Sequence, residues 1–114
     1  MICLDSTLKS LEIVLAGAIT TNQLDYTVSY VDIDSTASFA ISAVTEADGT
    51  SNSTTAVTVI AAPAASHERQ VKFLTVYNKD TVAATVTVRI NNNGTFRILS
   101  KTVLNVGDTL QYAS

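Results

Sequence analysis

The sequence predicts an all-β protein, either an antiparallel β-sandwich or a jelly-roll-like barrel of about eight short strands. Two observations lead to this fold class. First, the 114 residues include 17 Thr and 13 Val but few Leu, Lys or Glu, and this composition favours strands over helices. Second, short segments of alternating apolar and polar residues recur roughly every 8–12 residues, with turn signals between them.

Eight segments have the pattern of strands: residues 10–16, 26–33, 37–44, 55–62, 68–78, 83–91, 95–100 and 109–112. Residues 45–54 are polar and contain turn signals, so this stretch is predicted to be a loop. Pro63 lacks an amide donor and follows the fourth strand as a breaker. The pair Asn93-Gly94 predicts a tight hairpin turn of type I′, because these residue types supply positive φ angles.

The alternation also predicts which side chains enter the core. In residues 95–100, Phe96 and Ile98 are predicted to face inward. Further inward-facing residues are predicted at Leu11, Ile13, Leu15, Val86, Val88 and Ile90. Residues 26–33 are apolar first on one face and then on the other, which predicts a bulge or a strand buried on both faces. Residues 68–78 are also apolar on both faces, and such a second apolar face predicts cover by the protein's own loops or by a partner subunit.

The length fits one domain, which is predicted to span residues 10–114 after an N-terminal arm over residues 1–9. The start of the chain lacks the basic residues and the long apolar run of a signal peptide. The longest apolar stretch, residues 13–19, is too short to span a bilayer, so no membrane is expected as a partner. Cys3 is the only cysteine, so no internal disulfide can form, and it is interpreted as a small apolar residue.

Charge and motifs argue against several functions. The net charge is −3 and the seven Lys and Arg residues are scattered, so no nucleic acid is expected as a partner. Zinc-ligand spacings, P-loops and dinucleotide-binding motifs are lacking, so no cofactor is expected. His67 is interpreted as a loop residue, and without a nucleophile motif the protein is not expected to be an enzyme. Asp32 and Asp34 share a strand face, which would suit a cation or acid–base chemistry, but a solvated pair at a strand end is the commoner arrangement.

Several segments match a pattern found in other proteins: LDST at residues 4–7, KSLE at 9–12, VLAGA at 14–18, AVTVIAAPAAS at 56–66, RQVK at 69–72, LTV at 74–76, GT at 94–95 and GDTL at 107–110. Through these segments the chain resembles a family of small structural proteins encoded by tailed bacteriophages. The resemblance spans most of the chain and is weakest over residues 34–53. It is specific to phage virions but not to one location within the virion.

The resemblance implies a β-rich virion component without a catalytic motif, of the capsid decoration (cement) type. Such proteins are similar in size and commonly form trimers on the outside of the head. The expected partners are therefore the major capsid protein and further copies of the chain, which is made in the host cytoplasm. The alternatives are a tail, neck or fibre-base component, or a host- or carbohydrate-binding module. The lack of Trp weighs against sugar binding, which usually relies on exposed aromatic side chains.

Two sets of residues are candidates for these contacts. The expected capsid contacts, on an arm that reaches neighbouring subunits, are Ile2, Leu4 and Leu8. The residues expected in self-association, because they are predicted to point outward from strands, are Tyr30, Phe73 and Arg89. A protein that binds only the assembled lattice would stabilise that lattice by mass action.

Overall fold

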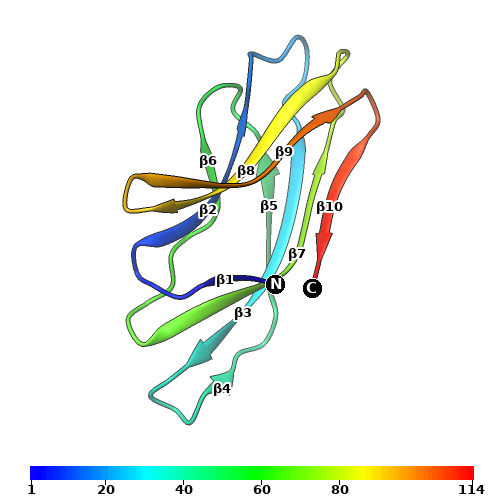
Figure 1. Ribbon diagram of the computed structural model, residues 1–114. Helices are drawn as coiled ribbons and strands as arrows, with labels where there is room; N and C mark the ends of the chain where they lie inside the picture. Colours follow the sequence, from blue (N-terminus) through cyan, green and yellow to red (C-terminus); the bar gives the residue numbers. More distant parts are fainter.

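The computed structural model describes all 114 residues. It contains ten strands and no helix, arranged as two antiparallel sheets that pack as a sandwich (Figure 1). The strands are β1 (Ile2–Leu4), β2 (Lys9–Leu15), β3 (Asp25–Asp34), β4 (Ala40–Ile41), β5 (Thr45–Thr50), β6 (Val57–Ile60), β7 (His67–Tyr77), β8 (Ala84–Asn92), β9 (Thr95–Leu104) and β10 (Thr109–Ala113). The predicted all-β sandwich is confirmed, with ten strands in place of about eight. None of the chain forms a helix long and apolar enough to cross a membrane.

The first sheet is built around β3 and β7, which pair along almost their whole length. The outer edge of β7 is shared by β1 and β10, and the outer edge of β3 is shared by β5 and β4. The second sheet has the order β6-β2-β8-β9. Its β8–β9 hairpin turns at Asn93 and Gly94, whose φ angles of 51° and 90° confirm the predicted turn with two positive φ angles.

The core lies between the two sheets. It is a cluster of 14 buried residues: Leu4, Leu11, Ile13, Leu15, Leu24, Val28, Val59, Ile60, Val71, Leu74, Val76, Val86, Val88 and Leu104. The inward predictions for β2 and for Val86 and Val88 are confirmed, and Ile90 packs partly buried against the cluster. These central strands follow the simple rule of alternation because both of their edges are paired.

The apolar pattern on both faces of β7 has its cause in a bulge. Ser29 of β3 lies opposite Phe73, and the next residue, Tyr30, lies opposite Val71, so Lys72 is the extra residue of β7. The extra residue changes the phase of the alternation, and Val71, Leu74 and Val76 therefore all enter the core. In β3 no residue is inserted, and Val31 is buried outside the core cluster, on the other face of the sheet.

Two predictions for residues 37–54 are wrong. The predicted strand over residues 37–44 is reduced to the two residues of β4, and Ser38 and Phe39 have positive φ angles of 56° and 58°. The predicted loop contains β5, which pairs with β3 over six residues. Strand pairing with a long partner overrides the local turn signal here, because each paired residue satisfies backbone groups that a loop would leave to water.

The inward prediction for Phe96 and Ile98 is also wrong, since both side chains are exposed. The register between β8 and β9 shifts: Val88 lies opposite Ser100 and Arg89 opposite Ile98. Because of this shift, the inner face of β9 carries Ser100 and the outer face carries the apolar residues. β9 is the last strand of its sheet, so one of its two edges has no neighbouring strand.

Candidate interaction surfaces

Six of the twelve exposed large apolar side chains lie in two groups, on and beside two strands at the edges of the sandwich. The first, here called the β4 surface, consists of Phe39, Ile41 and Val44, which are 69%, 67% and 64% exposed. The second, here called the β9 surface, consists of Phe96, Ile98 and Val103, on the outer face of β9. Single exposed apolar residues are common on protein surfaces, but contiguous groups of large ones mark sites of interaction.

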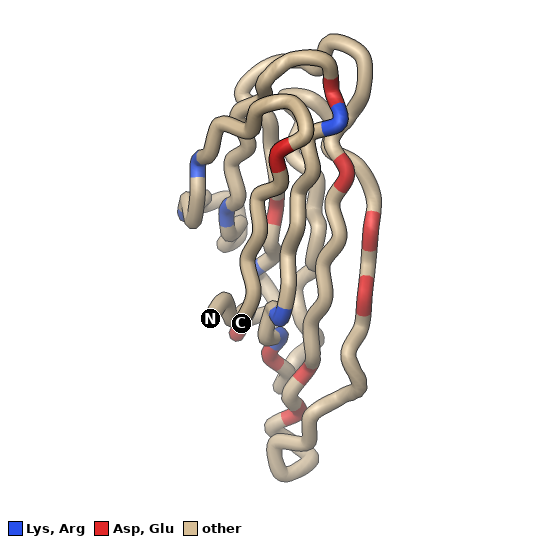
Figure 2. Tube along the Cα trace, turned by 90° about the vertical axis from the view of Figure 1, so that its right-hand side faces the viewer, with Lys and Arg blue, Asp and Glu red and all other residues tan.

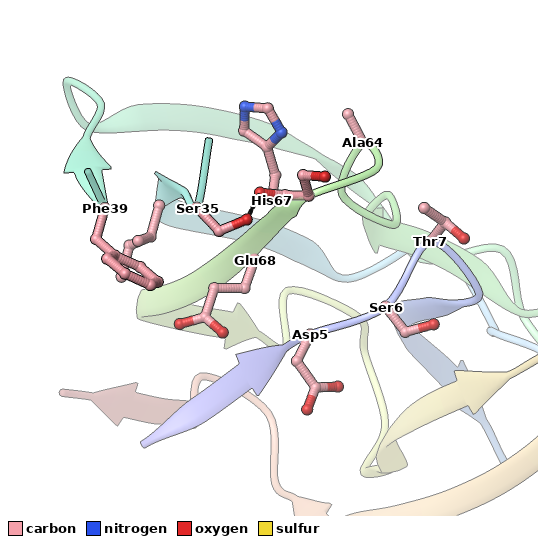
Figure 3. Close-up of a pocket in the computed structure, with 10 residues that line it drawn as sticks. Asp5, Ser6, Thr7, Ser35, Phe39, Ala64, His67 and Glu68 are labelled. Carbon is pink, nitrogen blue, oxygen red and sulfur yellow. Dashed lines mark hydrogen bonds between the residues drawn. The ribbon is translucent and has the colours of Figure 1, made fainter. Parts of the chain in front are cut away.

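The β4 surface lies at one end of the elongated molecule, which measures 48 × 27 × 18 Å (Figures 1 and 2). It adjoins a pocket of about 220 Å³ that is drawn in Figure 3. Phe39 stands on one side of the pocket, and Asp5, Ser6 and Thr7, which connect β1 to β2, stand on the other. The pocket brings together the start of the chain and the β3–β4 loop, which are far apart in the sequence.

Two polar side chains at this pocket, those of Ser35 and His67, contact neighbouring backbone carbonyl and carboxylate groups. The Ser35 hydroxyl donates to the carbonyl oxygen of Ser66 at 2.9 Å. The His67 ring places Nδ1 at 2.9 Å from the Ala65 carbonyl and Nε2 at 3.4 Å from an Asp34 oxygen. The imidazole therefore contacts a carbonyl and a carboxylate, and it makes no hydrogen bond to a hydroxyl nucleophile.

Asp32 and Asp34 line one pocket together with His67, but each carboxylate is bonded to a different partner. Arg69 donates from Nε to Asp32 at 2.9 Å, and its guanidinium lies 4.6 Å from the ring centroid of Tyr30. Asp34 accepts from the backbone N–H and the hydroxyl of Thr36 at 2.8 and 2.6 Å. The bonds from Thr36, helped by nearby His67, hold the pKa of the Asp34 carboxyl below its usual value. No group of three or more His, Cys, Asp or Glu side chains is placed to hold a metal ion.

The β9 surface rests on a buried ion pair. Arg89 Nε donates to Glu12 Oε1 at 3.0 Å, and Asn91 Nδ2 donates to Glu12 Oε2, also at 3.0 Å. The Arg89 guanidinium lies 3.7 Å from the ring centroid of Phe96. Arg89 thus contacts Glu12 and Phe96 within the chain, and its cation–π contact holds Phe96 against the sheet. Its role at this surface is to position an apolar side chain.

The three residues expected to contact the capsid, Ile2, Leu4 and Leu8, differ in how far they are buried. Leu4 is wholly buried in the core, so the expectation that it contacts a partner is corrected. Ile2 is partly buried, and its backbone N–H donates to the Tyr112 hydroxyl at 2.8 Å. The segment is not a free arm, because β1 fills the part of the β7 edge that β10 leaves open. Only Leu8, in the turn after β1, is exposed.

The residues expected in self-association do not form one surface. Tyr30 is partly buried and packs against the core. Phe73 lies on the outer face of the first sheet, opposite Ser29, and Arg89 lies on the outer face of the second sheet. The sequence reasoning missed the β4 and β9 surfaces. The available signal was a strand-like apolar pattern in each segment, but the pattern alone does not tell an inner face from an outer one.

A third feature is a cleft of about 550 Å³ between the sheets. It opens between β9 and β10, where Leu99 and Leu110 line its walls, and it reaches Leu74 and Val88 of the core. Ser100 and Thr102 give the β9 side of the cleft a polar lining. The sandwich is therefore incompletely closed at the β9 edge.

Comparisons with protein-family models, with curated proteins and with solved structures find no match. By its own structure, the chain is a β-sandwich with two exposed apolar surfaces at different places on the molecule.

Proposed function

We propose that the protein is a non-enzymatic structural component of a tailed-phage virion, a capsid decoration protein that binds the outside of the head and stabilises the capsid lattice. The observation that carries this proposal is the β4 surface. Phe39 has a positive φ angle, which is costly for a residue with a bulky side chain, and its ring is 69% exposed. A strained backbone that displays an aromatic side chain to solvent is readily explained when that side chain is a contact.

The contact surface that we propose for the capsid consists of Phe39 and Ile41 of the β4 surface together with Leu8. Leu8 is exposed and follows directly on Thr7, which lines the pocket on the side opposite Phe39. This arrangement keeps one of the three residues that the sequence analysis assigned to capsid binding and replaces the other two. The resemblance of the sequence to phage structural proteins supports the capsid as the partner.

The test is addition of the purified protein to heads that lack it, taken from the phage that encodes it. We expect saturable binding and a raised melting temperature of the heads, because a ligand of the assembled lattice stabilises it by mass action. Phe39→Ser combined with Ile41→Ser is expected to weaken binding. Val82→Ser is the matched control, since Val82 is exposed in the loop between β7 and β8, which lies at the opposite end of the molecule from β4 (Figure 1).

Three outcomes would contradict the proposal or change it. Binding of wild-type protein to tails and not to heads would favour the alternative of a tail, neck or fibre-base component. Adsorption to host cells in place of heads would favour a host-binding module. Equal binding by the Phe39/Ile41 variant and the Val82 variant would remove the β4 surface from the contact.

A further inference from the structure

We infer that copies of this chain associate head to tail, with β9 of one copy pairing along β5 of the next. Both strands lie at the end of a sheet, so each has one edge without a neighbouring strand. Within one molecule, β5 contacts β6 and β9 contacts β10, which places the two free edges on opposite sides of the sandwich. The two edges can therefore meet only between copies.

The two edges carry opposite charges that are not compensated within the chain. Four of the seven Lys and Arg residues form ion pairs, and the remaining three are Lys72, Arg97 and Lys101. Two of these three lie on β9. Figure 2 shows blue segments toward the left of the molecule, where the second sheet lies.

The uncompensated carboxylates lie on the other edge. Four of the ten Asp and Glu residues form ion pairs with Lys or Arg, Asp34 lies beside His67, and Asp80 and Asp108 accept backbone N–H groups. The remaining three are Glu46, Asp48 and Glu68. Glu46 and Asp48 belong to β5, which is the right-hand strand with two red segments in Figure 2. Charge complementarity thus favours β9 against β5, and like charges oppose β9 against β9.

The apolar side chains of the two edges agree with the same pairing. In an antiparallel ladder, a register with Lys101 opposite Glu46 also sets Val103 opposite Val44, because the partner strands run in opposite directions. Val103 and Val44 are 61% and 64% exposed in the single chain. This single register therefore forms an ion pair between Lys101 and Glu46. It also buries the exposed side chains of Val103 and Val44 on the same face of the new ladder.

A contact between two different edges is heterologous, so an open chain of copies keeps one free β5 edge at one end and one free β9 edge at the other. Further copies can therefore be added at either end until the assembly closes into a ring. The inference concerns only how copies join, so the protein can be tested without capsids, and the outcome does not depend on capsid binding.

The experiment is light scattering on the purified protein over a concentration series. We expect the wild-type mass to rise to a multiple of the 12.1 kDa chain. Arg97→Glu with Lys101→Glu, and separately Glu46→Lys with Asp48→Lys, are each expected to weaken association several-fold, since the attraction between Lys101 and Glu46 becomes repulsion. The variant that combines all four changes is expected to regain association, because its edges again carry opposite charges.

Lys72→Glu is the matched control, because Lys72 is also uncompensated but lies at the bulge of β7, away from both free edges. Circular dichroism establishes that each variant is folded. A wild-type chain that stays monomeric throughout the series would overturn the inference. Association that is insensitive to the β5 exchange, or that the combined exchange does not restore, would equally overturn it, because a symmetric β9–β9 contact does not involve β5.

Discussion

Asp80 shows how a single residue ties together segments far apart in the sequence. Its carboxylate accepts backbone N–H groups from Thr20, Thr21 and Asn22 of the β2–β3 loop at 2.7–3.0 Å, and from Thr81 at 2.8 Å. The residue is almost fully buried. These bonds favour the charged form and hold the pKa of Asp80 far below its usual value.

We expect Asp80→Asn to lower the melting temperature at pH 7, and the difference from wild type to shrink as the pH falls. The folded state holds the Asp80 pKa below its unfolded value of about 3.9, so the charged form stabilises the fold above that pH. This stabilisation is lost as the pH falls from about 5 toward the folded-state pKa. Melting temperatures measured at several pH values check this. Asp48→Asn is the control, and parallel pH profiles for wild type and Asp80→Asn would contradict the prediction.

Leu4 and Leu8 are the same residue type on one short segment, with opposite surroundings. Leu4 is wholly buried in the core and Leu8 is exposed in the turn. We expect Leu4→Ala to lower the free energy of unfolding by about 2–5 kcal/mol, and Leu8→Ala to change it by less than about 0.5 kcal/mol. Urea unfolding of both variants measures the contrast. Similar values for the two would mean that β1 behaves as a free arm.

At the scale of elements, the pairing of β5 with β3 depends on a close approach. Gly49 lies opposite Tyr26, and a Cβ atom at Gly49 would lie 2.8–3.0 Å from the end of the Tyr26 ring. A glycine at this place lets the ring lie across the edge strand. The pair Asp48-Gly49 is typical of a turn, but in this protein it lies within β5, where the glycine leaves room for the Tyr26 ring.

We expect Gly49→Ala to destabilise the protein by about 1–3 kcal/mol, because the Tyr26 ring must shift to admit the methyl group. Gly17→Ala is the matched control, since nothing lies within 4 Å of a Cβ placed there and its φ angle is not positive. That substitution is expected to be neutral or slightly stabilising, because alanine restricts the unfolded chain more than glycine does. Denaturant unfolding measures the free energy of unfolding of both variants. If Gly49→Ala left it unchanged, the Tyr26 ring would be free to move away from the added methyl group.

At the scale of the whole molecule, the sandwich is asymmetric in charge. Its internal ion pairs leave two cations on one free edge and two carboxylates on the opposite one. The net charge of −3 does not reveal this separation. An exposed arrangement of this kind acts between molecules at short range and is screened by salt.

We expect the average mass in solution to fall when NaCl is raised from about 0.1 M to about 1 M, because the Debye length shortens from about 10 Å to about 3 Å. The variant with Arg97→Glu and Lys101→Glu is expected to show no such fall, since its edges already repel each other. Light scattering in the two salt concentrations makes the comparison. A wild-type mass that rises with salt would indicate that apolar contacts alone hold the copies together.

Local sequence pattern was enough to predict the fold class, the central strands and their inward faces, and the turn at Asn93-Gly94. These features depend on local alternation and on residue types that suit one backbone conformation. Long-range packing was needed to establish that β1 joins the sheet, that residues 45–50 are a strand and that Phe96 and Ile98 face outward. The reason is that an edge strand has one partner, and a one-residue shift in its register reverses which side chains are buried. The surfaces that we propose for binding lie at such edges, so their residues were the hardest to predict from the sequence.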